Sequence, residues 1–246
     1  MTAWNSTAVS PLIVRRERAS ADPAADLAGG VDLLRAVATG DAPPTLRLYR
    51  PSPTLAFGQR DTRLAGYDAA ARLAAEAGFA PLIRRAGGRA AAYHEGTLIV
   101  DHVEPDADAM LGHQGRFRSL GALYAQALTT VGVDAHVGEL PGEYCPGEYS
   151  VHGRPSASSP VQNAIKLVGT AQRVVAGAWL FASVIVVENS APLRSVLTDV
   201  YDALELPIDP STAGAVDDLA PGVTVGDVER ALIAAYGHDM AINDNG

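Results

Sequence analysis

The chain of 246 residues contains one cysteine, Cys145, and one lysine, Lys166. A single cysteine excludes a disulfide within the chain and a zinc site built from several cysteines. The longest uncharged apolar run, residues 174–187, is shorter than the roughly 20 residues that a membrane-spanning helix needs. The arginines near the N-terminus follow a weakly apolar stretch, which is the wrong order for a secretory signal. We therefore expect a cytoplasmic protein with no membrane partner.

Positive charge is also scarce. The formal net charge is -9, so we expect no nucleic-acid partner, because nucleic-acid binding needs a positive surface. Of the 19 basic residues, Lys166 alone is not arginine. Lysine is a compact ammonium with a tunable pKa, so its single occurrence either marks a site that a guanidinium does not fit or is chance. The six histidines are scattered along the sequence, and we predict no metal site.

Apolar residues make up 48% of the chain and charged residues 19%, which allows a large core and argues against disorder. The length fits one domain. We predict a single domain over residues 1–246, with a core over 11–190 and a short C-terminal helical segment over 191–246.

Hydrophobic periodicity predicts strands and helices in an irregular order. The predicted strands are 11–14, 45–49, 54–57, 81–84, 91–103, 150–154, 165–168 and 179–187. The predicted helices are 22–38, 61–77 with Asp61 as N-cap, 116–131, 191–204, and 225–236 with Thr224 as N-cap. The strands 150–154 and 165–168 are expected to form a hairpin across a flexible Pro/Ser loop at 155–160. The pattern indicates an α+β fold with a mixed, largely antiparallel sheet flanked by helices.

A first candidate site lies between two predicted strands. It contains Arg84, Arg85, Gly87, Gly88, Arg89 and His94. Paired glycines let backbone N–H groups approach a ligand closely, and the arginines can bind a carboxylate, a phosphate or phosphopantetheine. The alternative is a Gly-Gly hairpin with solvated arginines and a packed histidine.

A second candidate site follows Lys166 along the chain. A short strand carries the lysine toward a predicted turn at Gly169 and Thr170, which Ala171 and Gln172 follow. A lysine beside exposed backbone amides can stabilise an oxyanion or an α-phosphate. The alternative is an ordinary hairpin with a surface lysine.

Cys145 lies in a Pro/Gly loop rather than in an apolar strand. A cysteine in a loop is a candidate for a reactive thiol. The alternative is a small, buried hydrophobic side chain.

The segment RRAGGRAAAYH at 84–94, followed by KLVGTAQR at 166–173, resembles the paired signature of the lipoate-protein ligase A/B and biotin ligase catalytic superfamily. The matching residues are Arg84, Arg85, Gly87, Gly88, Arg89, Ala90 and His94, then Lys166, Gly169, Ala171, Gln172 and Arg173. The stretch TLAFGQ at 54–59 resembles the family's early strand, so the resemblance covers most of residues 45–187. It implies a class II biotin/lipoate ligase-like catalytic domain in which these segments, with Thr170, bind the substrate. The chain departs from the family at 175–179, where many members have a His-Gly pair.

Within that superfamily, two features resemble the cysteine-dependent octanoyltransferases. Arg89 replaces a third glycine, and Cys145 with Tyr149 precedes the lysine motif. This resemblance implies that Cys145 is the nucleophile and that Lys166 stabilises the oxyanion. The implied reaction moves an octanoyl or lipoyl group from acyl carrier protein to the lysine of a lipoyl domain, with no cofactor. The acceptor would belong to a 2-oxoacid dehydrogenase complex or be the glycine cleavage H protein.

Two other functions stay open. An ATP-dependent lipoate-protein ligase would form lipoyl-AMP with ATP and Mg, hold it with Lys166 and the arginines, and leave Cys145 incidental. A non-catalytic module would keep the fold and bind a carrier protein.

Overall fold

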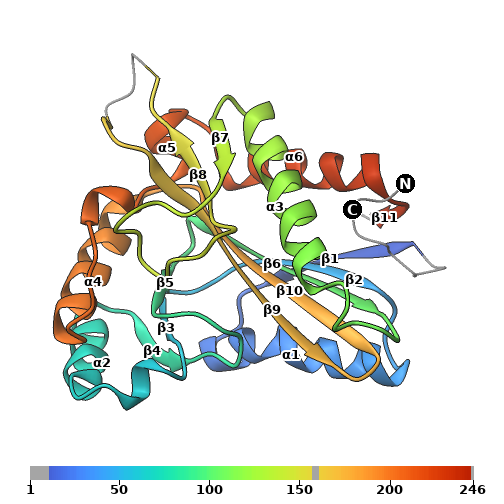
Figure 1. Ribbon diagram of the computed structural model, residues 1–246, viewed down its shortest axis with the longest axis horizontal. Helices are drawn as coiled ribbons and strands as arrows, with labels where there is room; N and C mark the ends of the chain where they lie inside the picture. The colour runs from blue at the N-terminus through green and yellow to red at the C-terminus, as the bar shows by residue number, and fades with distance from the viewer. Residues whose placement is uncertain (1–10, 157–160, 245–246) are drawn as a thin grey trace.

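The computed structural model describes residues 11–156 and 161–244. Within them, a sheet of eight strands runs through the centre of the molecule (Figure 1) in the order β11-β1-β2-β6-β10-β9-β8-β7. The strands are β1 Leu12–Arg18, β2 Thr45–Arg50, β6 Thr97–Pro105, β7 Asp134–Val137, β8 Val151–Arg154, β9 Ile165–Val175, β10 Ala178–Val186 and β11 Ile242–Asp244. The pairs β1–β11 and β1–β2 are parallel and the other pairs are antiparallel.

A second, smaller sheet has β3 Thr54–Phe57 at its centre. This strand pairs in parallel with β4 Ala80–Ile83 and antiparallel with β5 Ala91–Tyr93. Together the two sheets confirm the predicted α+β class with mixed, largely antiparallel pairing. The predicted single strand at 91–103 is wrong, because the chain turns between β5 and β6 and changes sheet. Gly96 permits this turn, since a Cβ there would lie 2.5 Å from the Glu188 carbonyl oxygen.

Helices cover both faces of the large sheet (Figure 1). Helix α1 Pro23–Thr39 lies on one face, and α3 His113–Thr130 and α6 Val225–Asp239 lie on the other. Helices α2 Tyr67–Glu76 and α4 Ser190–Ala203 pack together beside the small sheet. The short helix α5 Val216–Leu219 and two 3-10 turns, Asp61–Arg63 and Pro210–Thr212, complete the helical elements of the described residues.

Local capping explains where two of the predicted helices begin. The Asp22 side chain accepts a hydrogen bond from the Ala24 N–H at the start of α1. Thr224 and Asp227 form a reciprocal capping box at the start of α6, as the predicted N-cap at Thr224 requires.

The predicted helix at 61–77 is wrong in its first part. The carboxylate of Asp61 accepts the Gly58 N–H at 2.8 Å and pairs with Arg89 at 3.0 Å, so it does not cap a helix. The chain forms a 3-10 turn at Asp61–Arg63, and α2 begins at Tyr67.

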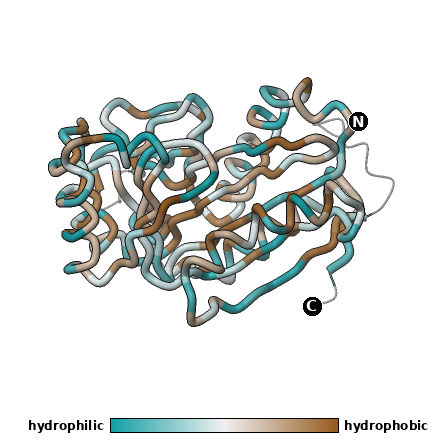
Figure 2. Tube along the Cα trace, turned by 90° about the horizontal axis from the view of Figure 1, so that it is seen from below, coloured by the Kyte–Doolittle hydropathy of each residue, from teal (hydrophilic) through white to brown (hydrophobic). Residues whose placement is uncertain are grey.

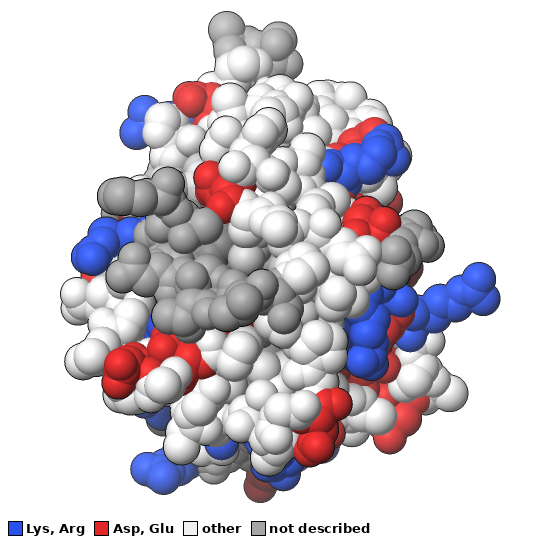
Figure 3. Space-filling model, turned by 90° about the vertical axis from the view of Figure 1, so that its right-hand side faces the viewer, with Lys and Arg blue, Asp and Glu red and all other residues white. Residues whose placement is uncertain are grey.

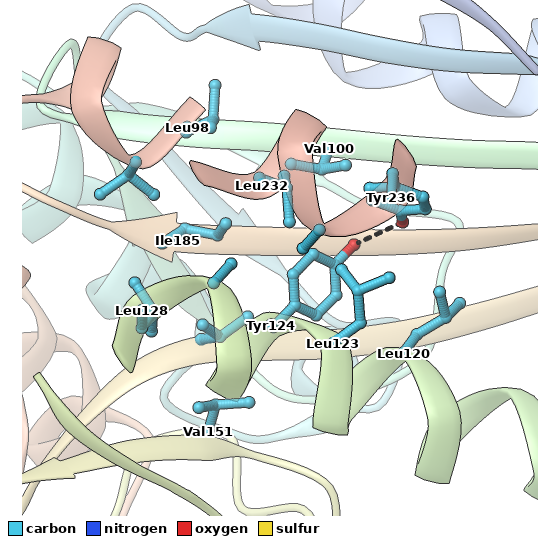
Figure 4. Close-up of a cluster of buried hydrophobic side chains, with 14 of the residues drawn as sticks. Leu98, Val100, Leu120, Leu123, Tyr124, Leu128, Val151, Ile185, Leu232 and Tyr236 are labelled. Atoms are coloured by element: carbon cyan, nitrogen blue, oxygen red, sulfur yellow. Dashed lines mark hydrogen bonds between the residues drawn. The ribbon is translucent and has the colours of Figure 1, made fainter. Parts of the chain in front are cut away.

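The main core lies between the large sheet and helices α3 and α6 (Figure 4). Leu120, Leu123 and Leu128 on α3 meet Leu232 on α6 and Ile185 on β10. The buried hydroxyls of Tyr124 and Tyr236 lie 3.4 Å apart across the two helices. In Figure 2, hydrophobic segments run through the interior strands and hydrophilic segments lie at the periphery.

Strands β8 and β9 form the predicted hairpin; of its bridging loop at 155–160, residues 157–160 lie outside the described part of the chain. The predicted turn at Gly169 and Thr170 is wrong. Both residues lie within β9, because they pair with Val184 and Ser183 of β10 and the strand continues to Val175.

Charged side chains of both signs are interspersed on the face shown in Figure 3. Over residues 11–156 and 161–244, none of the helices has the length and apolar character that crossing a membrane requires.

Candidate active site

A cavity of about 380 Å³ brings the candidate segments together. Helix α1, the large sheet and the loops around Gly88 and Cys145 contribute its walls. The predicted site residues that line it are Arg84, Arg85, Gly87, Gly88, Cys145, Lys166, Gly169, Thr170, Ala171 and Gln172. The side chains of Arg89 and His94 have other positions, described below.

The Cys145 thiol lies beside the Gly-Gly loop. Its Sγ accepts hydrogen bonds from Arg84 Nη2 and from the Arg89 backbone N–H, both at 3.2 Å. Cys145 has a left-handed backbone with φ of 44°, which a non-glycine residue adopts only when its surroundings hold it there. Its N–H donates to the Tyr201 hydroxyl at 2.6 Å, and that hydroxyl donates to the Ala90 carbonyl at 3.0 Å. Helix α4 therefore fixes the cysteine loop to the glycine loop.

The surroundings of the thiol favour the thiolate. Burial alone raises the pKa of Cys145, but the positive charges of Arg84 and Lys166 and the hydrogen bonds to Sγ outweigh it. The pKa of Cys145 is therefore lower than that of an ordinary cysteine. A lowered pKa increases the fraction of thiolate, which is the nucleophilic form.

Arg84 has no carboxylate partner among the described residues. Its side chain is buried, Nη2 also donates to the Arg89 carbonyl at 2.6 Å, and Nε has no hydrogen-bond partner. A buried guanidinium without a counter-ion is costly. When Cys145 ionises, its thiolate is the counter-ion that Arg84 lacks, so each group favours the charged form of the other.

Gly88 is required for this contact. Its φ is 103°, and a Cβ there would lie 2.3 Å from Arg84 Nη2 and 2.7 Å from Cys145 Sγ. Strands β4 and β5, on either side of the loop, pair with β3 instead of with each other. The alternative of a Gly-Gly hairpin is therefore wrong.

Lys166 is buried, with an exposed fraction of 1%, so the alternative of a surface lysine is also wrong. Nζ donates to the carbonyls of Tyr144 at 3.0 Å and Cys145 at 2.8 Å, and lies 3.5 Å from Glu143 Oε2. Burial lowers the pKa of Lys166, although the negative charges of Cys145 and Glu143 act in the opposite direction. The lysine thus holds the backbone of the cysteine loop.

Glu143 completes the anchoring of this loop. Its Oε1 accepts hydrogen bonds from the Gly147 N–H at 2.9 Å and the Ser150 hydroxyl at 2.8 Å. Its other oxygen, Oε2, faces Lys166. The same carboxylate therefore contacts the lysine and the residues that follow Cys145 in the loop.

The side chains of His94 and Arg89 contact other protein groups. The His94 ring lies 2.8 Å from the Asn189 carbonyl through Nε2, and Nδ1 accepts the Gly96 N–H at 2.9 Å. It does not line the cavity. The Arg89 guanidinium pairs with Asp61, so only its backbone N–H reaches the thiol.

The floor of the cavity is made of small residues on the large sheet. Gly169 and Ala171 on β9 lie beside Val184 and Ala182 on β10. Leu27 and Val31 of α1 also line the cavity. The small side chains leave space for a narrow apolar ligand.

Sequence reasoning missed three residues of the site. Tyr201 occupies the apolar face of a helix and gives no separate signal. Glu143 stands out only as a neighbour of Cys145. Asp101 lines the cavity from β6, and a charged residue inside an apolar strand is a signal that could have found it.

The chain matches the model of the family described as lipoyl protein ligase A/B catalytic domain over residues 22–237. It is 27% identical over 167 residues to the octanoyl-[GcvH]:protein N-octanoyltransferase of Geobacillus kaustophilus, covering 67% of this chain and 55% of that protein. It is 24% identical over 172 residues to the lipoyl-[GcvH]:protein N-lipoyltransferase of Listeria monocytogenes, covering 69% and 58%. The chain therefore spans about half the length of the curated relatives it matches.

Solved structures share the fold. Protein Ta0514 of T. acidophilum, with bound lipoic acid, superposes with a TM-score of 0.68 and 21% identity, covering 96% of this chain and 88% of that chain. Lipoate-protein ligase A bound with ATP superposes with a TM-score of 0.66 and 20% identity, covering 97% and 90%. From the family match over residues 22–237, this chain belongs to the lipoyl protein ligase A/B catalytic domain family.

Proposed function

We propose that this chain is an acyltransferase that moves an octanoyl or lipoyl group to a lysine of a lipoyl-carrying protein through a thioester on Cys145. One observation carries the proposal: Sγ receives two N–H donors at 3.2 Å at the wall of a cavity. A thiolate held in this way is the form that attacks an acyl carbonyl.

The proposed reaction has two steps. Sγ attacks the acyl carbonyl, the bond to the donor's leaving atom breaks, and the leaving group takes a proton. The acceptor amine then attacks the thioester carbonyl and loses a proton, the carbon–sulfur bond breaks, and the thiolate returns to Arg84. The thioester keeps the acyl group activated, so the transfer needs no ATP.

Lys166 and Arg84 act around this nucleophile. Lys166 positions the loop through the carbonyls of Tyr144 and Cys145, and we propose that its charge also stabilises the oxyanion. Arg84 loses its counter-ion when Cys145 is acylated. The return of the thiolate restores that ion pair and favours the second step.

Two donors fit the same thiolate. The sequence resemblance predicts acyl carrier protein, a thioester donor. The names of the relatives from Geobacillus kaustophilus and Listeria monocytogenes favour an acyl group on GcvH. The proposed acceptor is the lysine of a lipoyl domain of a 2-oxoacid dehydrogenase complex or of the glycine cleavage H protein.

The ATP-dependent ligase and the non-catalytic module are the competing functions. A ligase would use Lys166, Arg84 and Arg85 to hold the phosphate of an acyl-adenylate, with ATP and Mg. The lowered pKa of Cys145 has no use in that reaction, which is why we favour the transferase.

One set of incubations separates these functions. The protein is mixed with octanoyl acyl carrier protein, with octanoyl-GcvH, or with octanoate, ATP and Mg, and intact mass follows each protein. We expect octanoyl mass on the wild-type chain that neutral hydroxylamine removes, and none on Cys145→Ser. Full activity of Cys145→Ala that requires ATP and releases pyrophosphate would establish the ligase. If no mixture gives transfer, the non-catalytic binding module is the function that remains.

A further inference from the structure

One end of the cavity is closed by two apolar side chains. Leu180 on β10 and Val31 on α1 both line the cavity, and their exposed fractions are 2% and 6%. Both also belong to an apolar cluster that α1 forms with β6 and β10. The other buried members of this cluster are Leu33, Leu34, Val37, Val103 and Ala178. The cavity therefore ends against a packed part of the core at Leu180 and Val31.

The reacting thiol lies toward the opposite end. Lys166 Nζ donates to the Cys145 carbonyl at 2.8 Å, and a Cβ on Gly169 would lie 3.7 Å from Lys166 Cε. The loop that carries the thiol is therefore near Gly169 of β9, which is opposite Val184 of β10. Leu180 is four residues from Val184 along β10, a separation of about 13 Å at 3.3 Å per residue.

Small and apolar residues line the passage between these two ends. Ala171 and Ala182 are opposite each other on β9 and β10 and form its floor. Leu27, Gly30 and Val31 of α1 line the other side. Leu27 and Val31 are four residues apart on the helix, so they lie on one face and follow the same direction as the floor. The passage suits one extended hydrocarbon chain.

Asp101 lies at the side of this passage. It is on β6, opposite Ala182, and its Oδ2 accepts a hydrogen bond from Arg47 Nη1 at 2.8 Å. A Cβ on Gly30 would lie 2.6 Å from Oδ2, so the carboxylate packs against the backbone of α1. Because Arg47 compensates the charge, a hydrocarbon chain can run past it over β9 and β10.

The length of the passage agrees with that of an octanoyl chain. An extended chain advances about 3.6 Å over three bonds, so the seven bonds from the carbonyl carbon to the terminal methyl group span about 8 Å. An apolar contact adds about 4 Å. The terminal methyl group therefore reaches the side chains of Leu180 and Val31. Further methylene groups would have to displace these side chains from a close-packed cluster.

We propose that Leu180 and Val31 determine the length of the acyl group that the chain accepts, with an unbranched backbone of eight carbon atoms as the optimum. This proposal deepens the acyl transfer proposed above and rests on it. Octanoyl and lipoyl groups share that backbone. A shorter acyl group leaves part of the passage empty, and a longer one overpacks its closed end.

The test compares three neutral mimics of an acyl-lysine, N-methylhexanamide, N-methyloctanamide and N-methyldecanamide, by titration calorimetry. We expect the wild-type chain to bind the octanamide about 15-fold more tightly than the hexanamide, since each buried methylene group contributes about fourfold. The decanamide should bind more weakly than the octanamide. Leu180→Ala and Val31→Ala each remove carbon atoms from the closed end. In both variants the decanamide should become the tightest-binding amide.

Leu34→Ala is the matched control. Leu34 belongs to the same apolar cluster and has an exposed fraction of 0%, but it does not line the cavity. Its truncation should lower the melting temperature, as that of Leu180 does, and should leave the octanamide as the tightest-binding amide.

Three results would overturn the length selection: equal or tighter binding of the decanamide by the wild-type chain, an unchanged order of affinities in Leu180→Ala and Val31→Ala, or a reversed order in Leu34→Ala. Thermal melting checks that each variant folds. If Leu180→Ala does not fold, the order of affinities in Val31→Ala, the smaller truncation, decides.

A parallel measurement separates this proposal from the acyl transfer. Intact mass follows Cys145 with hexanoyl, octanoyl and decanoyl acyl carrier protein, and with the same three acyl groups on GcvH. Tightest binding of the octanamide without acylation from either carrier would contradict the transferase alone. Equal rates of acylation by the three acyl groups would contradict the length selection alone. Absence of both binding and acylation would contradict both.

Discussion

At the scale of single residues, the reactive centre depends on two cations with different partners. Arg84 faces the thiol of Cys145, and Lys166 faces two carbonyls and the carboxylate of Glu143. Both positive charges lower the pKa of the thiol, and Arg84 does so more strongly and by direct contact. Lys166 in addition holds the backbone of the loop that carries the thiol.

Arg84→Gln should raise the pKa of Cys145, because it removes the nearest positive charge and one donor to Sγ. The thiolate fraction falls as the pH drops through the pKa, so a raised pKa moves the midpoint of thiol alkylation to higher pH. We expect alkylation by iodoacetamide at pH 6 to slow about tenfold or more. Arg85→Gln is the matched control, since its side chain does not contact Sγ and its midpoint should stay near that of the wild-type chain. An unchanged midpoint in Arg84→Gln would contradict the ion pair.

Lys166→Arg should lose most of the acyl transfer while the chain remains folded. Lys166 is enclosed on all sides, and the larger planar guanidinium cannot reproduce its contacts with both carbonyls. We expect a loss of about 100-fold in the rate of Cys145 acylation and a destabilisation of about 1–3 kcal/mol from overpacking. The control Arg35→Lys exchanges the same two residue types at an exposed position. It should leave the rate of acylation and the stability unchanged. Near-normal transfer by Lys166→Arg would show that the scarcity of lysine is chance.

At the scale of helices and strands, the sequence predicted an element correctly where contacts between residues close in the sequence determine it. Helices α1 and α6 begin directly after their N-caps, Asp22 and Thr224, because each cap contacts a residue two or three positions away. The predictions were wrong where a distant contact decides. Asp61 forms an ion pair with Arg89, and Gly169 lies in a strand because it pairs with β10.

The residues of the candidate site also divide into those that the local sequence indicates and those that only distant contacts bring into place. The family motifs and the rare residue types indicate Lys166, Cys145 and the glycine loop from the sequence alone. No local pattern could show that Tyr201 bridges the Cys145 N–H and the Ala90 carbonyl, because its sequence neighbours are an ordinary amphipathic helix.

Thr224→Ala should destabilise the chain by about 1 kcal/mol, because it removes the side-chain half of the capping box at the start of α6. The midpoint of urea unfolding measures the change. Thr129→Ala is the control: this exposed threonine lies near the end of α3 and donates to the Ala125 carbonyl within its own helix. Its replacement should change stability by less than about 0.5 kcal/mol. Equal losses in both variants would show that the cap is not the cause.

At the scale of the whole molecule, the cavity lies where several layers meet. Helix α1, strands β6, β9 and β10 and the loop after β4 all contribute to its lining. A ligand in the cavity therefore contacts segments that are far apart in the sequence, and its binding should stabilise the folded chain as a unit.

A bound acyl amide should raise the melting temperature with a single transition. At 100 times its Kd, one ligand adds about 2.7 kcal/mol of stability, which is about 5–10 °C for a chain of this size. Differential scanning fluorimetry measures the shift. Ala182→Leu is the control, because the added side chain projects from the floor of the cavity and should abolish the shift. A shift of the same size in Ala182→Leu would place the ligand elsewhere.

The glycine and alanines of the cavity floor have one more consequence. They are on β9 and β10, whereas the thiol is on a loop that Glu143, Lys166 and Tyr201 hold in place. In the proposed reaction, the fit of the acyl group and the attack by the thiol therefore depend on different parts of the chain. A single exchange on a strand can alter which acyl group is accepted while the reacting atoms keep their positions, so a lineage can acquire a new substrate without rebuilding its nucleophile.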